Sequence, residues 1–161
     1  MYLGCTTTLI IRLYRKFESL MLDALVGAVN NDTATISTTT GVKFPEHLTD
    51  EVCEFLIVGT SYFDYKGRDG LIRKLREFVP EDHYLVAIVK KPSFKEAIEL
   101  LSALRNFAAH ESDLSKRAAL TAIDGERIES SGAWLKRADR FKTMINRLKG
   151  LAADVESAAP Y

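Results

Sequence analysis

Two residues in the segment 104–110 carry side chains that phosphate chemistry uses. Arg105 offers a planar fork of donors that matches phosphate oxygens. His110 carries an imidazole, whose ordinary pKa of about 6.5 allows proton exchange near neutral pH. Asn106 follows Arg105 and lies one helical turn before His110. Because phosphodiester cleavage needs both an anion-binding group and a proton-transfer group, these residues form the candidate catalytic set.

The spacing of these residues limits how they can act together. On an ideal α-helix, residues five positions apart point roughly 140° away from each other. Arg105 and His110 of one chain therefore cannot converge on one phosphate unless the helix ends before His110. Asn106 and His110 share a face, because residues four apart are neighbours on a helix. A twofold dimer would bring two copies of the set to one cleft.

The order Arg105-Asn106, then Ala109-His110, late in one helix of a predicted all-α bundle, resembles the signature of HEPN domains (higher eukaryotes and prokaryotes nucleotide-binding). That signature is an Arg, commonly a polar residue next, and a His a few residues later. The ribonuclease-type HEPN proteins are the nearest match. The resemblance covers most of the chain in architecture, but only about seven residues specifically.

The resemblance implies a metal-independent endoribonuclease without a cofactor, with its site at a homodimer interface. The ribose 2′-hydroxyl of RNA would attack the adjacent phosphorus, while His110 moves a proton and Arg105 steadies the growing charge. Asn106 would orient His110 or bind a phosphate oxygen. Such proteins include toxins of toxin–antitoxin and defence systems, which adds an antitoxin protein as a possible partner. Some of them are silenced through a Tyr two residues after the His, and here that position holds Ser112.

Other functions fit the same residues. Arg105 can bind carbonyls at the end of a helix, and His110 can favour its negative end, without any catalysis. Glu111 and Asp113 lie beside His110 and could neutralise Arg105 by pairing with it. The alternatives are a catalytically silent helical dimerisation or interaction module, and an RNA-binding protein that does not cleave.

A basic segment supplies candidate RNA-binding residues. From Trp134 to Gly150 the chain has six basic residues and one acidic residue, although its net charge is zero. This segment predicts either a solvated helix face or a surface that faces phosphates. The candidate RNA-binding residues are Lys136, Arg137 and Arg140.

Length and composition predict a single domain over residues 1–161, with a tail over 155–161 that frays. A hydrophobic content of 47% supports a packed core and argues against global disorder. Cys5 and Cys53 have no partners at metal-binding spacing, so we expect neither a metal site nor a disulfide framework. The apolar runs are too short for a membrane helix, and we expect a cytoplasmic protein.

The fold class predicted from periodicity is all-α, a HEPN-like helical bundle of four or five main helices with short additional helices. Breaks are expected at the Thr-rich segment 33–41, favoured as a loop, at the turn 66–70, and after His110. The predicted helices cover 8–29, 50–62, 71–79, 83–89, 94–110, 114–123 and 131–155.

Local signals refine three of these helices. Thr49 or Asp50 is expected to cap the helix over 50–62, whose inner face would hold Val52, Phe55, Leu56 and Gly59. Ser93 with Glu96 reads as a capping box that starts a helix near Phe94. The last helix is expected to bury residues that recur at helical spacing, namely Trp134, Ala138, Phe141, Ile145, Leu148 and Val155.

The remaining histidines are weaker candidates. His47 lies in a predicted loop, where surface placement is expected, and His83 fits the entry to a helix. No glycine-rich phosphate loop follows a strand, which excludes nucleotide hydrolysis of the P-loop type.

Overall fold

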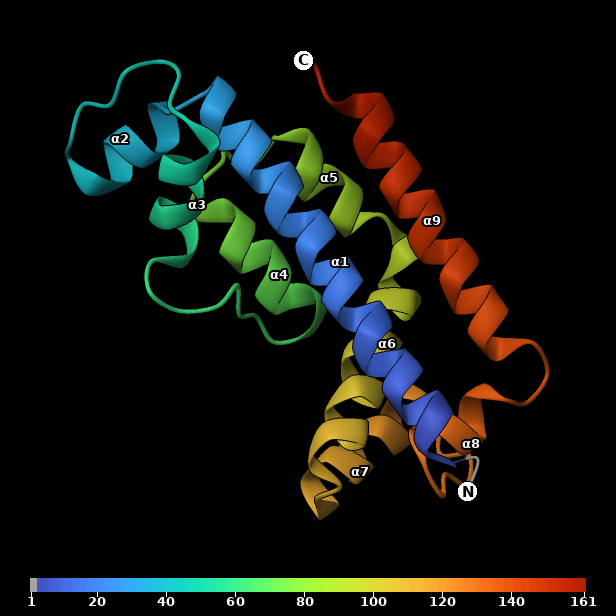
Figure 1. Cartoon of the computed structure of the whole chain (residues 1–161). Coiled ribbons are helices and arrows are strands. Elements are labelled where there is room, and N and C mark those ends of the chain that lie inside the picture. The colour runs from blue at the N-terminus through green and yellow to red at the C-terminus, as the bar shows by residue number, and fades with distance from the viewer. Residues whose placement is uncertain (1–2) are drawn as a thin grey trace. The chain divides into compact units, whose positions relative to one another are not determined.

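The computed structural model describes the backbone of residues 3–161 and the side chains of residues 7–161. Over that range nine α-helices follow one another without a strand (Figure 1). The all-α class is therefore confirmed, while the HEPN fold and the single domain stay predictions. Two compact units divide the chain, and each is described by itself. The first contains the chain up to Phe17 and Pro92–Leu151, and the second contains Glu18–Lys91 and Ala152–Tyr161.

The first helix, α1 (Leu3–Asn31), contains the segment 8–29 and confirms the helix predicted there. Its buried side chains recur every three or four residues, as an apolar stripe on a helix requires. They are Ile10, Tyr14 and Phe17 in the first unit, and Met21, Leu25, Val26, Ala28 and Val29 in the second.

The Thr-rich segment of the second unit is a short helix, α2 (Ala34–Thr40), so the predicted loop is wrong. Three threonine hydroxyls donate to carbonyls four residues earlier, which satisfies these polar side chains on the helix itself. Burial of Ile36 anchors the helix, and Gly41 ends it with a φ of 71°. The three donors are Thr38, Thr39 and Thr40.

The next helix, α3 (Asp50–Val58), begins as predicted after Thr49, whose hydroxyl accepts a hydrogen bond from the Val52 N–H. The helix ends before the predicted position at Tyr62, because Gly59 adopts a φ of 60° that a helix cannot continue through.

The predicted inner face of α3 is wrong. Phe55 is 62% exposed and Val52 is 43% exposed, whereas Cys53 and Ile57 are buried. Apolar residues lie on both of these faces, so periodicity alone does not say which one packs. Tertiary packing buries the face that holds Cys53 and Ile57.

The helices α4 (Gly67–Arg76) and α5 (Tyr84–Lys90) pack against each other in the second unit. The start of α4 lies inside the predicted turn 66–70, and α5 confirms the helix predicted over 83–89. The Arg68 Nε donates to the Val89 carbonyl at 2.9 Å, which ties the start of α4 to the end of α5.

In the tail over 155–161, the last helix extends to Ala158. The Tyr161 hydroxyl lies 2.9 Å from the Tyr84 hydroxyl. A Cβ added at Gly27 would lie 3.3 Å from the Tyr161 side chain, so the Tyr161 ring packs closely over this glycine. These contacts hold the C-terminal tail against the second unit.

In the first unit, α6 (Pro92–His110) carries the candidate catalytic residues. Pro92 is the first helical residue, where a missing N–H leaves no intrahelical bond unmade. Ser93 is therefore inside the helix, and the prediction that it caps a helix starting at Phe94 is wrong. Apolar spacing predicts that Ala97, Leu101, Leu104 and Ala108 form the buried stripe of this helix; the first three are buried, and Ala108 is half-buried.

The polar break after His110 leads into α7 (Asp113–Ala122), which packs against α6. Ser112 caps α7 in a reciprocal arrangement with Ser115, whose backbone N–H donates to the Ser112 hydroxyl at 3.2 Å. The short helix predicted over 114–123 is confirmed to within one residue at each end.

The prediction of one long helix over 131–155 is wrong. The segment forms two helices, α8 (Ser131–Leu135) and α9 (Arg140–Ala158). Between them Ala138 and Asp139 have φ values of 49° and 55°, in the left-handed region that an α-helix cannot contain. The short α8 is held in place by Ser131, whose buried hydroxyl donates to the Leu104 carbonyl at 2.7 Å.

Candidate functional site

The candidate catalytic residues lie near the end of α6. Asn106 and His110 are exposed, and Arg105 is half-buried. His110 is the last residue of α6, so its imidazole stands where the chain leaves the helix. An exposed imidazole at a helix end is open to a substrate as large as a nucleic acid.

The Arg105 guanidinium is positioned by two contacts. Its central carbon lies 4.8 Å from the centroid of the Tyr14 ring, a cation–π distance. Its Nη1 donates to the Asn106 side-chain oxygen at 3.0 Å. Among the residues that the structure describes, no ion pair joins Arg105 to Glu111 or Asp113. The neutralisation that the sequence allowed is therefore not observed.

The helix continues through His110, so Arg105 and His110 of one chain stay about 140° apart around its axis. The structure brings Arg105 together with Asn106, and it places Asn106 and His110 one turn apart on an exposed face. It does not bring Arg105 and His110 to one phosphate within a single chain.

Acidic side chains surround the end of α6. Glu111 has a φ of 46° and turns the chain away from the helix. A hollow of about 290 Å³ lies there, lined by Glu111, Asp113 and Glu129 and by the single base Lys116, among other residues. More carboxylates than cations line it, so this hollow by itself does not attract RNA.

The predicted RNA-binding residues have different surroundings. Lys136 and Arg137 follow α8 and are exposed. Arg140 instead packs its guanidinium 4.3 Å from the centroid of the Trp134 ring and pairs with Glu126 at 2.6 Å. Its Nη1 is buried without a hydrogen-bond partner. Arg140 is therefore engaged inside the protein, whereas Lys136 and Arg137 have exposed side chains.

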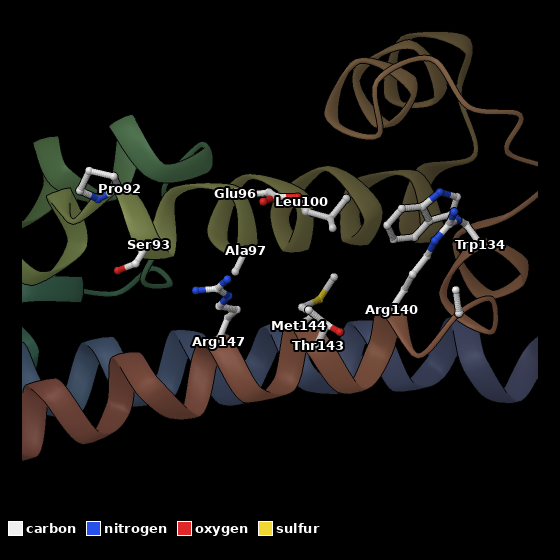
Figure 2. A pocket seen from close by; sticks show the side chains of 11 residues that line it. Pro92, Ser93, Glu96, Ala97, Leu100, Trp134, Arg140, Thr143, Met144 and Arg147 are labelled. Carbon is white, nitrogen blue, oxygen red and sulfur yellow. The ribbon is translucent and has the colours of Figure 1, made fainter.

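A cavity of about 360 Å³ lies between α6 and α9 in the first unit (Figure 2). Trp134, predicted as core, is 8% exposed and lines it. The sequence reasoning missed this cavity, because its walls come from α6 and from the residues after the unpredicted break at Ala138 and Asp139. The only sequence signal for it is the excess of basic over acidic residues in 134–150, because two of these basic residues, Arg140 and Arg147, line the cavity. Its residues include Ser93, Ala97, Leu100, Thr143, Met144 and Arg147.

The other histidines are placed as expected. His47 is exposed, and its Nδ1 lies 3.1 Å from the Asn30 carbonyl. His83 is the N-cap of α5, where its Nδ1 accepts a hydrogen bond from the Leu85 N–H. Burial lowers the pKa of His83, while Asp32 and Asp82 partly offset that effect.

The Cys53 thiol is buried and free, and burial raises its pKa, with a smaller contribution from Asp50. The Cys5 side chain lies outside the described residues. In the described part of the chain, His, Cys, Asp and Glu side chains form no group of three that could hold a metal ion. No helix in the same range has both the length and the apolar character needed to cross a membrane.

No family model, no curated protein and no solved structure matches this chain.

Proposed function

We propose that this protein is a metal-independent endoribonuclease of HEPN type, with its site completed by a second copy of the chain. The observation that carries the proposal is the exposed face at the end of α6, where Asn106 and His110 lie one turn apart beside Arg105. The contact with Tyr14 supports it further, because a guanidinium held over a ring loses little freedom when it binds a phosphate.

The chemistry needs one nucleophile, which the RNA itself supplies. His110 accepts the proton of a ribose 2′-hydroxyl, and the resulting oxygen attacks the adjacent phosphorus. The P–O bond to the next 5′ oxygen breaks, and the His110 imidazolium returns its proton to that leaving oxygen. The products are a 2′,3′-cyclic phosphate and a 5′-hydroxyl. Arg105 stabilises the charge on the phosphate oxygens, and DNA resists because it lacks the attacking hydroxyl.

The second copy follows from the geometry of α6. Because Arg105 and His110 diverge on a helix that continues through His110, one chain does not present both to one phosphate. A twofold axis near the ends of two α6 helices would set the Arg105 of one copy beside the His110 of the other. Lys136 and Arg137 would bind flanking phosphates, which makes binding depend on salt.

A toxin or defence role with a protein antitoxin would suit such an enzyme. Ser112, at the position where some HEPN toxins carry a modifiable Tyr, here caps α7 through its hydroxyl. Silencing through that Tyr is therefore not part of the proposal, and an antitoxin would act by covering the end of α6.

The test is cleavage of mixed cellular RNA by purified protein in excess chelator. Wild type is expected to leave 2′,3′-cyclic phosphate ends, and His110→Ala is expected to lose at least about 100-fold of the rate. His47→Ala is the matched control, because His47 is also an exposed histidine but lies in the second unit. Equal cleavage by wild type and His110→Ala would overturn the role of His110.

One observation favours a second function, a catalytically silent dimerisation or interaction module. The stacking of Arg105 on Tyr14 and its hydrogen bond to Asn106 are also what a purely structural arginine makes. Under this reading, Arg105→Ala lowers stability and His110→Ala changes nothing. Intact RNA with both wild type and His110→Ala, together with a dimer in solution, would favour it.

A further inference from the structure

The cavity between α6 and α9 lies away from the candidate catalytic set. Its volume of about 360 Å³ is at the lower end of the range for small-molecule sites. At about 30 Å³ for each water-sized group, it holds on the order of ten non-hydrogen atoms. None of Arg105, Asn106 and His110 lines it. Its size suits a small molecule rather than a strand of RNA.

One wall of the cavity is apolar. Ala97 and Leu100 contribute from α6, Met144 contributes from α9, and all three are buried. Trp134 closes one end (Figure 2). An apolar ligand body that replaced water on this wall would bind through the hydrophobic effect.

Arg147 brings a positive charge to the cavity. Figure 2 shows Arg147 extending from α9 toward α6. Arg147 is exposed, and in the described part of the chain no carboxylate lies within ion-pairing distance of it. A guanidinium without an acidic partner, beside an apolar wall, favours a planar or tetrahedral anion.

Two other charged residues, Arg140 and Glu96, line the cavity. The Arg140 guanidinium is paired with Glu126 and covers the Trp134 ring. Glu96 also lines the cavity, so one carboxylate stands there beside the two guanidinium groups of Arg140 and Arg147. The hydroxyls of Ser93 and Thr143 add hydrogen-bond donors to the lining.

We infer that this cavity binds a small amphipathic anion, with an apolar body on the Ala97–Leu100–Met144 wall and a carboxylate or phosphate on Arg147. The inference does not depend on RNA cleavage, because the cavity shares no residue with the candidate catalytic set. A ligand at this site would bridge α6 to α9 and hold the first unit in one arrangement.

The chain reports on this site without a label, because Trp134 is its only tryptophan and lines the cavity. Octanoate and octyl phosphate, each titrated into the full chain, are expected to change the Trp134 fluorescence with saturation. 1-Octanol and octylamine have the same apolar body without the negative charge, and are expected to bind at least about tenfold more weakly. Saturation by octanoate alone assigns a carboxylate ligand, and saturation by octyl phosphate alone assigns a phosphate ligand.

Two variants locate the binding. Arg147→Gln is expected to weaken binding of the anion at least about tenfold, whereas Lys149→Gln, on an exposed lysine of α9 outside the cavity, is expected to leave it unchanged. Ala97→Met fills the space and is expected to abolish binding, with helix content by circular dichroism as the check on folding. The inference fails if neither anion saturates, if 1-octanol binds as tightly, or if Arg147→Gln and Lys149→Gln behave alike.

Discussion

Two helix ends in the first unit each place an arginine over an aromatic ring, but the surroundings of the two arginines differ. At the end of α6, Arg105 lies over Tyr14 and hydrogen-bonds to the neutral amide of Asn106. At the start of α9, Arg140 lies over Trp134 and pairs with the carboxylate of Glu126. An arginine paired with a carboxylate has little charge left for a phosphate. Surroundings, and not residue type, therefore separate the candidate catalytic arginine from the structural one.

The difference between the two arginines is tested most directly by replacing each one with alanine and measuring both RNA cleavage and stability. Arg105→Ala is expected to lower RNA cleavage by about 100- to 1,000-fold, because it removes the group that steadies the phosphate charge. Arg140→Ala is expected to keep cleavage within a fewfold and to lower the unfolding free energy by about 1–2 kcal/mol. Cleavage assays and urea unfolding of both variants measure this. Loss of cleavage in Arg140→Ala alone would reverse the assignment.

The aromatic ring under Arg140 should matter more for stability than the arginine. Trp134 is 8% exposed, so Trp134→Ala is expected to cost about 3–5 kcal/mol of unfolding free energy. Tyr62, which is 89% exposed, provides the control, and Tyr62→Ala is expected to change stability by less than about 0.5 kcal/mol. Urea unfolding followed by circular dichroism tests both. Similar costs for Trp134→Ala and Tyr62→Ala would show that Trp134 is not part of the core.

In the turn after α6, we expect Ser112 to contribute to stability and not to RNA cleavage. Ser112→Ala removes the cap of α7 and is expected to cost about 1 kcal/mol, while cleavage stays unchanged. Ser112→Asn should recover most of that stability, because Asn is also a good N-cap. A loss of cleavage in Ser112→Asn would instead place Ser112 in the catalytic site.

The smallest expected effect is a pH dependence in the second unit. Burial lowers the folded-state pKa of His83, so below about pH 6.5 the unfolded state binds more protons and stability falls. Protonation also removes the Nδ1 acceptor that caps α5. Wild type should lose stability between pH 7.5 and 5.5, measured by urea unfolding, and His83→Asn should lose less. An equal loss in both would show that another group titrates.

The sequence predicted elements whose apolar periodicity was strong or whose start was marked by a capping residue. The helix over 8–29 and the cap at Thr49 were confirmed on these grounds. The break in the segment 131–155 was missed, because neither Ala138 nor Asp139 is a residue that marks a left-handed turn as Gly would. The helix Ala34–Thr40 was missed because its threonine hydroxyls donate hydrogen bonds to carbonyls of the same helix. Composition does not reveal these hydrogen bonds.

For the candidate site, the sequence predicted the residues but not their long-range contacts. Residue types and spacing identified Arg105, Asn106 and His110 and showed that the first and last diverge on one helix. The stacking of Arg105 on Tyr14 joins residues about ninety positions apart in the chain, and only packing brings them together. The pairing of Arg140 with Glu126 depends on the same kind of long-range contact.

The most direct test of a site shared by two copies is to mix two inactive variants. Arg105→Ala and His110→Ala are purified separately, exchanged into mixed dimers that are verified by tags, and assayed for RNA cleavage in chelator. In a mixed dimer the Arg105 of one chain meets the His110 of the other, so cleavage is expected to return to at least about a tenth of the wild-type rate. Verified mixed dimers that stay inactive, beside an active wild type, would contradict the shared site.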